Sequence, residues 1–289
     1  MPRKGPPEGC VHYQTAVQML IDAGVIQTGT MIYKIWENYG LTTAKLSDVL
    51  SPREKEKTKT KTRERGFYRL SDIKMVIEKE NMFRKIGLTG TWKSNPSTVF
   101  RQAIAEDLPA ILDMSLKIFC EPPTLETRLR WLREEPESLF VLTNHDGTIL
   151  GYSSIIAVEE RAMHAFAHGL TDSSTMVAQR FVPGPPLHLY VMALAIDPVY
   201  IRTQKHTYGA ALLRGVIGFL FALAERGVDI ETITARSNKP DGIRLLKELS
   251  IPQIKSPVPD KKLFYLKVSD SGHEVFEQYR FLRYNGMHE

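Results

Sequence analysis

Four lysines in the first third of the chain have a spacing that could bind phosphate groups. Lys55, Lys57, Lys59 and Lys61 occupy alternate positions in the stretch EKEKTKTKTRER, residues 54–65, with threonines between the later ones. Because a β-strand repeats every two residues, a strand here would present the lysines on one face. Such a ladder of cations can follow the phosphates of a polyanion. A solvated, flexible charged loop is the alternative.

The uneven distribution of charge supports a polyanionic partner. The whole chain of 289 residues has a net charge of +5, but residues 1–99 contain 17 Lys and Arg against 10 Asp and Glu, so the remainder is slightly acidic. A basic region of this kind indicates contact with a polyanion, with nucleic acid the first choice.

Composition indicates a globular protein with about two domains. Apolar residues make up 43% and charged residues 25% of the chain, which are ordinary values for soluble proteins. The two cysteines, Cys10 and Cys120, have no metal-binding or redox spacing, as expected for a reducing cytoplasm. The apolar run at 215–224 is shorter than the ~20 residues of a membrane span, so it predicts a buried helix face. We expect a cytoplasmic protein without a signal peptide or membrane contact.

The N-terminal third reads as short helices and a basic hairpin. Residues 1–9 are rich in Pro and Gly and predict a disordered tail. Apolar spacing predicts a helix that stops at Ala23-Gly24 and a second one that ends at Gly40. A short strand at 66–70 and a helix capped by Ser71 follow. Residues 86–97 read as a linker.

Two motifs in this part resemble the winged-helix DNA-binding domain of MerR-type regulators. They are YKIWENYGL at 33–41 and GFYRLSD at 66–72, and the resemblance covers residues 10–85. It implies DNA as a partner, the charged stretch as the wing, and assembly as a homodimer. The residues implied in DNA binding are Lys34, Lys55, Lys57, Lys59, Lys61, Arg63 and Arg65.

The second part predicts an α/β fold with a mixed sheet flanked by helices. Strands are expected at 98–104, on both sides of a turn at Asn144–Gly147, and at 187–196, 231–237 and 262–268. Helices are expected at 105–119, 124–136, 209–226 and 241–249. With the small N-terminal winged helix-turn-helix domain, this is the expected fold class.

The order of these elements and four local motifs resemble the GNAT acyltransferases over residues 98–268, with 269–289 as a C-terminal extension. AIDP at 195–198 ends a strand, and Gln204 to Gly209 stand before a helix with Leu212-Leu213. Asn238 follows a strand, and LLKELSI stands at 245–251. The resemblance implies an acetyl-CoA-dependent N-acetyltransferase, or one that uses another acyl-CoA, acting on an unknown amine acceptor.

The resemblance also implies where the acyl-CoA would bind. Its pyrophosphate would lie at the loop and helix start near Gln204, where backbone N–H groups bind anions. Its pantetheine would pair with the edge of the preceding strand. The implied residues are Ala193, Leu194, Ala195, Ile196, Gln204, Lys205, His206, Thr207, Tyr208, Gly209, Ala210 and Asn238.

Catalytic residues are not identified by these patterns. The family's usual tyrosine falls at Leu246, which cannot donate a proton. Three candidates for acid or base remain: Tyr208, His188 and Tyr190. Glu160, His164 and His168 share a helix face but lack a fixed fourth ligand, so no metal site is predicted. We expect that helix to be an amphipathic lid over the acceptor site.

Three functions are compatible with the sequence. The first is an N-acetyltransferase that carries a DNA-binding module. The second is a transcription regulator whose GNAT-like domain senses acyl-CoA without turnover, which the leucine at position 246 favours. The third is a non-enzymatic adaptor whose first domain binds protein.

Overall fold

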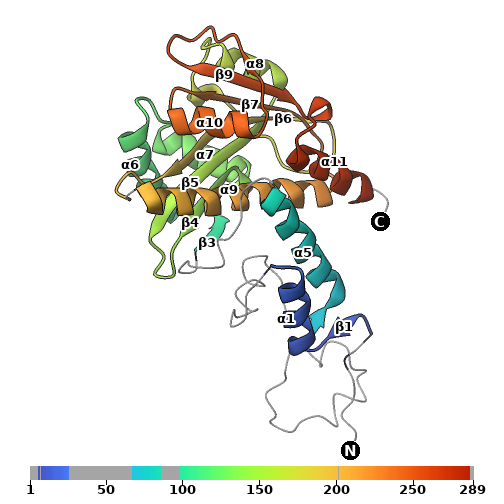
Figure 1. Ribbon diagram of the computed structural model, residues 1–289. Helices are drawn as coiled ribbons and strands as arrows, with labels where there is room; N and C mark the ends of the chain where they lie inside the picture. The colour runs from blue at the N-terminus through green and yellow to red at the C-terminus, as the bar shows by residue number, and fades with distance from the viewer. Residues whose placement is uncertain (1–5, 7, 26–66, 86–97, 201, 287–289) are drawn as a thin grey trace, which may run out of the picture. The chain divides into compact units, whose positions relative to one another are not determined.

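The chain divides into two compact units, residues 1–97 and 98–289, which are considered separately. The computed structural model describes residue 6 and residues 8–25, 67–85, 98–200 and 202–286 (Figure 1). The predicted second helix with Lys34, the charged stretch with the other six predicted DNA-binding residues, and the predicted linker lie outside the described residues.

In the described part of the first unit, two helices pack on a short two-stranded sheet. Strand β1 (Cys10–Val11) pairs antiparallel with β2 (Tyr68–Arg69). Helix α1 (Tyr13–Asp22) and helix α5 (Leu70–Lys85) bury Leu20 and Ile73 in a common core. Helix α1 ends at Asp22, directly before the predicted stop at Ala23-Gly24, and Gly24 has a left-handed φ of 68°.

One predicted helix boundary in this unit was wrong. Helix α5 already includes Leu70, so Ser71 lies in its first turn and is not the capping residue. Strand β2 ends at Arg69, directly before the helix, so Arg69 occupies the capping position.

The second unit is a seven-stranded mixed sheet flanked by helices, which confirms the predicted architecture. The strand order is β3-β4-β5-β6-β7-β9-β8, and β6 and β7 are the parallel pair. The strands are β3 (Val99–Gln102), β4 (Leu139–Thr143), β5 (Ile149–Val158), β6 (Leu187–Ile196), β7 (Ile230–Ser237), β8 (Gln253–Ile254) and β9 (Lys262–Lys267). The helices are α6 (Leu108–Ile118), α7 (Leu125–Glu134), α8 (Glu160–Ala167), α9 (Arg202–Glu225), α10 (Pro240–Glu248) and α11 (Glu274–Gly286).

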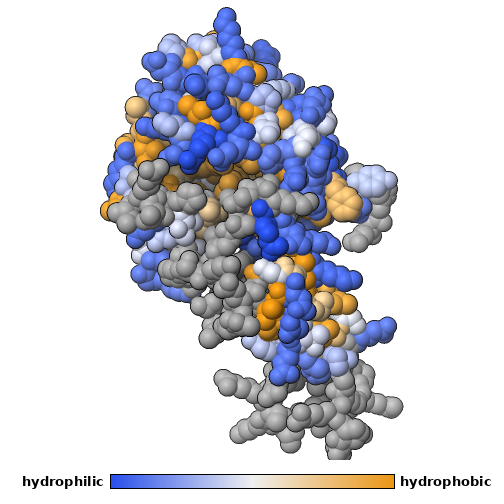
Figure 2. Space-filling model, in the orientation of Figure 1, coloured by the Kyte–Doolittle hydropathy of each residue, from blue (hydrophilic) through white to orange (hydrophobic). Residues whose placement is uncertain are grey.

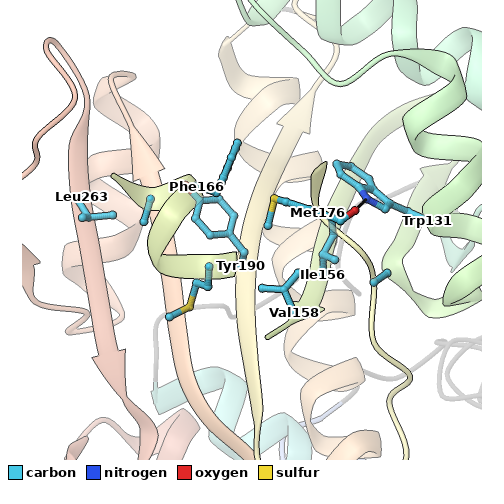
Figure 3. Packing of buried hydrophobic residues seen from close by; sticks show 10 residues of the cluster. Trp131, Ile156, Val158, Phe166, Met176, Tyr190 and Leu263 are labelled. Atoms are coloured by element: carbon cyan, nitrogen blue, oxygen red, sulfur yellow. Dashed lines mark hydrogen bonds between the residues drawn. The ribbon is translucent and has the colours of Figure 1, made fainter. Parts of the chain in front are cut away.

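One face of the sheet is covered by α6, α7 and α8. Trp131 of α7 and Phe166 of α8 are buried with Ile156, Val158 and Tyr190 of the strands (Figure 3). The indole of Trp131 donates a hydrogen bond of 2.9 Å to the carbonyl of Met176 in the segment that follows α8. Helix α8 therefore belongs to the core layer over β6 and β7.

The other face is covered by α9, with α11 packed along it. Phe219 of α9 meets Phe140 of β4 with 4.6 Å between ring centroids. In the described part of the chain α9 is the one helix long and apolar enough to cross a membrane, yet half of that stretch is buried. Its apolar residues therefore serve the core, as the sequence predicted. Among the surface residues of this unit seen in Figure 2, hydrophilic ones predominate.

Candidate functional site

Strands β6 and β7 pair at one end and separate at the other. The parallel pairing runs from Leu187↔Ile230 to Val191↔Ala235 and then stops. Strand β6 continues to Ile196 and remains paired with β5 on its other side. The backbone edge of residues 192–196 therefore has no β7 partner. We call this opening, with residues 236–237 on its β7 side, the β6–β7 gap.

A β-bulge in β6 lies where the gap begins. Ser154 of β5 pairs with Ala193, whereas the next residue, Ile155, pairs with Val191, so Met192 is the extra residue. A bulge shifts the alternation of side chains by one. Tyr190 and Ala193 consequently both pack on the face covered by α6, α7 and α8. The bulge thus changes both the direction of β6 and the set of side chains beside the gap.

Helix α9 begins soon after the end of β6. Asp197 organises the connection, because its carboxylate accepts a hydrogen bond of 3.0 Å from the backbone N–H of Val199. The helix then starts at Arg202, seven residues earlier than the predicted Gly209. The predicted loop from Gln204 to Tyr208 is therefore wrong, since these residues form the first two turns of α9.

This earlier start changes which backbone groups can bind an anion. The first four N–H groups of a helix have no partner within the helix, and they carry the positive end of its dipole. In α9 the first turn begins at Arg202, whereas the N–H of Gly209 lies inside the helix. A Cβ at Gly209 would meet no atom within 4 Å, so the glycine is not required by packing.

The remaining predicted binding residues lie around the same end of the sheet. Ala193 to Ile196 form the unpaired β6 edge. Lys205, His206, Thr207 and Ala210 belong to the start of α9, and Asn238 is exposed immediately after β7. The ring of Tyr208 packs edge-on against Tyr200 at 5.0 Å.

Among the catalytic candidates, His188 has both ring nitrogens close to β7. Its Nδ1 lies 2.9 Å from the hydroxyl of Thr232, and its Nε2 lies 4.0 Å from the carboxylate of Glu231. Only 12% of the side chain is exposed. The contact with Thr232 engages Nδ1, so the contacts of this histidine fit a role in joining β6 to β7.

Tyr190 is buried beside the point where the strands separate. Burial raises the pKa of its phenol to about 12, although the nearby Arg236 opposes this effect. The phenol is therefore protonated at neutral pH. Such a high pKa is poorly matched to proton transfer near pH 7. Position 246, where the family tyrosine is expected, is a leucine buried in α10.

Arg236 was not identified from the sequence, although it is the single charged residue in the strand stretch TITARS. Its Nε–H donates a hydrogen bond of 3.0 Å to the hydroxyl of Tyr190. Its guanidinium carbon lies 4.4 Å from the ring centroid of Phe166. These contacts fix a cation at the β7 side of the gap. They depend on α8, which sequence spacing does not place beside β7.

The candidate metal ligands do not form a cluster. His164 Nε2 lies 3.7 Å from a carboxylate oxygen of Glu160, and the rings of His164 and His168 are 6.0 Å apart. Among the residues that the structure describes, no group of three His, Cys, Asp or Glu side chains could hold a metal ion.

Comparison with known proteins gives structural matches only. No family model and no curated protein sequence matches the chain. The second unit is similar to Ard1 from Thermoplasma volcanium, with 15% identity, a TM-score of 0.41, and coverage of 59% of this chain and 97% of that one. The ribosomal-protein-S18-alanine N-acetyltransferase from Escherichia coli matches with 19% identity, a TM-score of 0.39, and coverage of 61% and 96%.

A third match is Arabidopsis thaliana NAA60 in complex with acetyl-CoA, with 15% identity, a TM-score of 0.40, and coverage of 60% of this chain and 99% of that one. Because the TM-scores are below 0.5, the proposal below rests on this chain's own topology and residues. The described architecture is an α/β unit with a mixed sheet that opens between its two parallel strands.

Proposed function

We propose that residues 98–268 form an acyl-CoA-dependent N-acyltransferase, with acetyl-CoA the first candidate. The observation that carries the proposal is the β6–β7 gap, whose unpaired edge at residues 192–196 leads directly to the start of α9. An extended pantetheine can pair with a free strand edge. The first turn of a helix can bind a pyrophosphate. Both parts are present in the order that the sequence resemblance to GNAT acyltransferases implies.

In this proposal the chain supplies two binding surfaces and a fixed geometry. The edge at residues 192–196 would hold the amide-rich arm, and the backbone N–H groups at the start of α9 would hold the pyrophosphate. Lys205 and His206 add basic residue types to the same two turns. Asn238 stands at the exposed end of β7, on the other side of the gap.

The thioester supplies an activated acyl carbon. In the transfer, an unprotonated amine would form the new C–N bond while the C–S bond breaks, and the thiolate would take up a proton. Holding an amine beside a thioester removes much of the entropic barrier. Nδ1 of His188 and the hydroxyl of Tyr190 both make hydrogen bonds within the sheet, so we assign these residues to positioning and expect water to carry the protons.

Binding can be tested by calorimetric titration with acetyl-CoA. In a Lys205→Glu variant we expect the dissociation constant to rise roughly 10-fold or more, because exchanging a positive for a negative charge in the first turns of α9 would repel the phosphates. Acidic residues are favourable in the first turn of a helix, so the variant should still fold. Lys247→Glu, in the last turn of α10, is the matched control and should bind normally. Wild-type protein that does not bind acetyl-CoA at millimolar concentration would refute the proposal.

For residues 10–85 we propose DNA binding, supported by the resemblance to MerR-type domains and by the excess of basic residues. Replacing Lys55, Lys57, Lys59 and Lys61 by Ala should weaken binding to all DNA sequences. It should also reduce the slope of log affinity against log salt by up to ~3–4. An unchanged slope in a filter-binding series would exclude these lysines from the interface.

The buried Leu246 supports a second candidate function, a regulator that senses acyl-CoA without turnover. In that case acetyl-CoA would shift DNA affinity, and DNA would shift acetyl-CoA affinity by the same factor. Acetyl transfer to any amine together with DNA affinity indifferent to acetyl-CoA would favour the enzyme. The reciprocal shift without transfer would favour the regulator.

A further inference from the structure

The β6–β7 gap contains a cation that the proposed transfer reaction does not by itself require. Arg236 directly follows Ala235, the last β7 residue paired with β6, and remains paired with Leu263 of β9 on its other side. Its backbone is therefore fixed in the sheet while its β6-facing side borders the gap. Its side chain lies on the same sheet face as Tyr190 and Phe166.

The contacts of Arg236 orient the guanidinium without neutralising it. The Nε–H is used by the Tyr190 hydroxyl, and one face of the group covers the Phe166 ring. Figure 3 shows the side chains of Phe166, from α8, and Tyr190, from β6, next to each other. No carboxylate among the described residues forms an ion pair with Arg236, and neither of its Nη groups has a hydrogen-bond partner there.

An arginine in this state is suited to bind an oxyanion. Its terminal N–H groups match the two oxygens of a carboxylate or phosphate, and such charge-assisted pairs are stronger than neutral hydrogen bonds. The charge also acts against other ligands, because a cation repels an acceptor whose only charged group is an ammonium. The gap therefore selects for negative charge close to the reacting amine.

We propose that the acceptor is an amine that carries a carboxylate or phosphate group, and that the guanidinium of Arg236 binds this group. The inference rests on the proposed acyl transfer. It adds a substrate class and a specificity-determining residue, with Tyr190 and Phe166 as the positioning residues that hold the guanidinium.

The test uses wild-type protein, acetyl-CoA and matched pairs of acceptors. Each α-amino acid is compared with its amide, and 2-aminoethyl phosphate with ethanolamine, by the rate of thiol release. Each rate is divided by the concentration of unprotonated amine, because the carboxylate or phosphate group changes the pKa of the amine in the same molecule. We expect kcat/KM to be roughly 10- to 100-fold higher for the anionic member of the preferred pair, as for other hydrogen bonds to charged groups.

Variants separate recognition from a structural role. Arg236→Leu should bring the anionic and neutral members to similar kcat/KM, whereas Arg236→Lys should keep part of the preference. If Arg236 had only a structural role, Arg236→Leu would lower kcat/KM for the anionic and the neutral acceptor by the same factor. Arg244→Leu, on the exposed surface of α10, is the control and should keep the wild-type ratio. If Arg236→Leu does not fold, the ratio measured on wild-type protein still decides the question.

Each outcome has a distinct meaning. Preference for the carboxylate or for the phosphate member, lost in Arg236→Leu, supports the inference and identifies the group. Equal rates for both members of every pair would overturn it. Acetyl-CoA binding without acylation of any anionic amine would also overturn it and leave the cofactor site standing. Absence of acetyl-CoA binding would instead refute the proposed function.

Discussion

Two glycines of α9, one turn apart, should respond in opposite directions to the same substitution. A Cβ at Gly215 would lie 2.3 Å from the ring of Phe100 on β3, whereas a Cβ at Gly218 would meet no atom within 4 Å. The Phe100 ring cannot retreat easily, because it is stacked on Phe140 with 4.9 Å between centroids. Gly215 therefore sets how closely α9 approaches the sheet. The same contact determines where the N-terminal end of α9 lies relative to the strands.

The magnitudes follow from helix propensity and overpacking. Alanine is favoured over glycine in a helix by about 1 kcal/mol, so Gly218→Ala should raise the melting temperature by about 2–4 °C. At Gly215 the same gain is opposed by overpacking of about 1–3 kcal/mol, with the upper end expected for a stacked ring. The net loss of about 2 kcal/mol should lower the melting temperature by about 4–8 °C.

Differential scanning calorimetry of both variants checks this prediction. Adding Phe100→Leu to Gly215→Ala should recover part of the loss, because the two sites share one contact. A Gly215→Ala protein that melts at or above the wild-type temperature would show that α9 can shift away from β3 freely. The close contact would then not determine where the N-terminal end of α9 lies relative to the sheet.

Two further substitutions test the packing of the second unit. The buried hydroxyl of Tyr279 donates to the carbonyl of Val228 at 2.6 Å and accepts from the N–H of Ile230 at 2.8 Å. Because both groups would lose their partner, Tyr279→Phe should lower the free energy of unfolding in urea by about 2–4 kcal/mol. An unchanged unfolding midpoint would contradict this. Hydrogen bonds from Arg101 hold the pKa of Asp107 in the folded protein below its ordinary value. The carboxylate therefore stabilises the fold at a pH above its pKa in the unfolded chain, and this contribution is lost as the pH falls through its pKa in the folded protein. Asp107→Asn should therefore melt below wild type at pH 7, with the difference closing below about pH 4, and a difference independent of pH would refute the assignment.

The architecture of the second unit was predictable because its strands are strongly marked. Strand β6 has the predicted bounds, 187–196, since a run that is apolar except for His188 is bounded by Pro186 and by Asp197-Pro198. The turn at Asn144 to Gly147 is likewise present, with Gly147 at φ 85°. Periodicity and turn residues are local signals, so sequence alone indicates them.

Features that depend on distant partners were not predictable. The start of α9 was placed too late because polar residues followed by Gly209 look like a loop, yet no residue between Arg202 and Tyr208 breaks a helix. The bulge at Met192 exists only relative to β5, and no local pattern marks it. Helix α11 was missed although Val275, Phe276 and Tyr279 have helical spacing.

The separation of β6 from β7 places a free strand edge inside the sheet and not at its border. Free edges invite pairing with other proteins and so promote aggregation, and short strands at the border reduce this risk. Both border strands here are short, with four residues in β3 and two in β8. The inner edge has strands on both sides and helical layers over both faces, so a slender extended molecule can reach it more readily than a strand from another protein. The fold thereby keeps hydrogen-bonding capacity for a small ligand without offering a template for self-association.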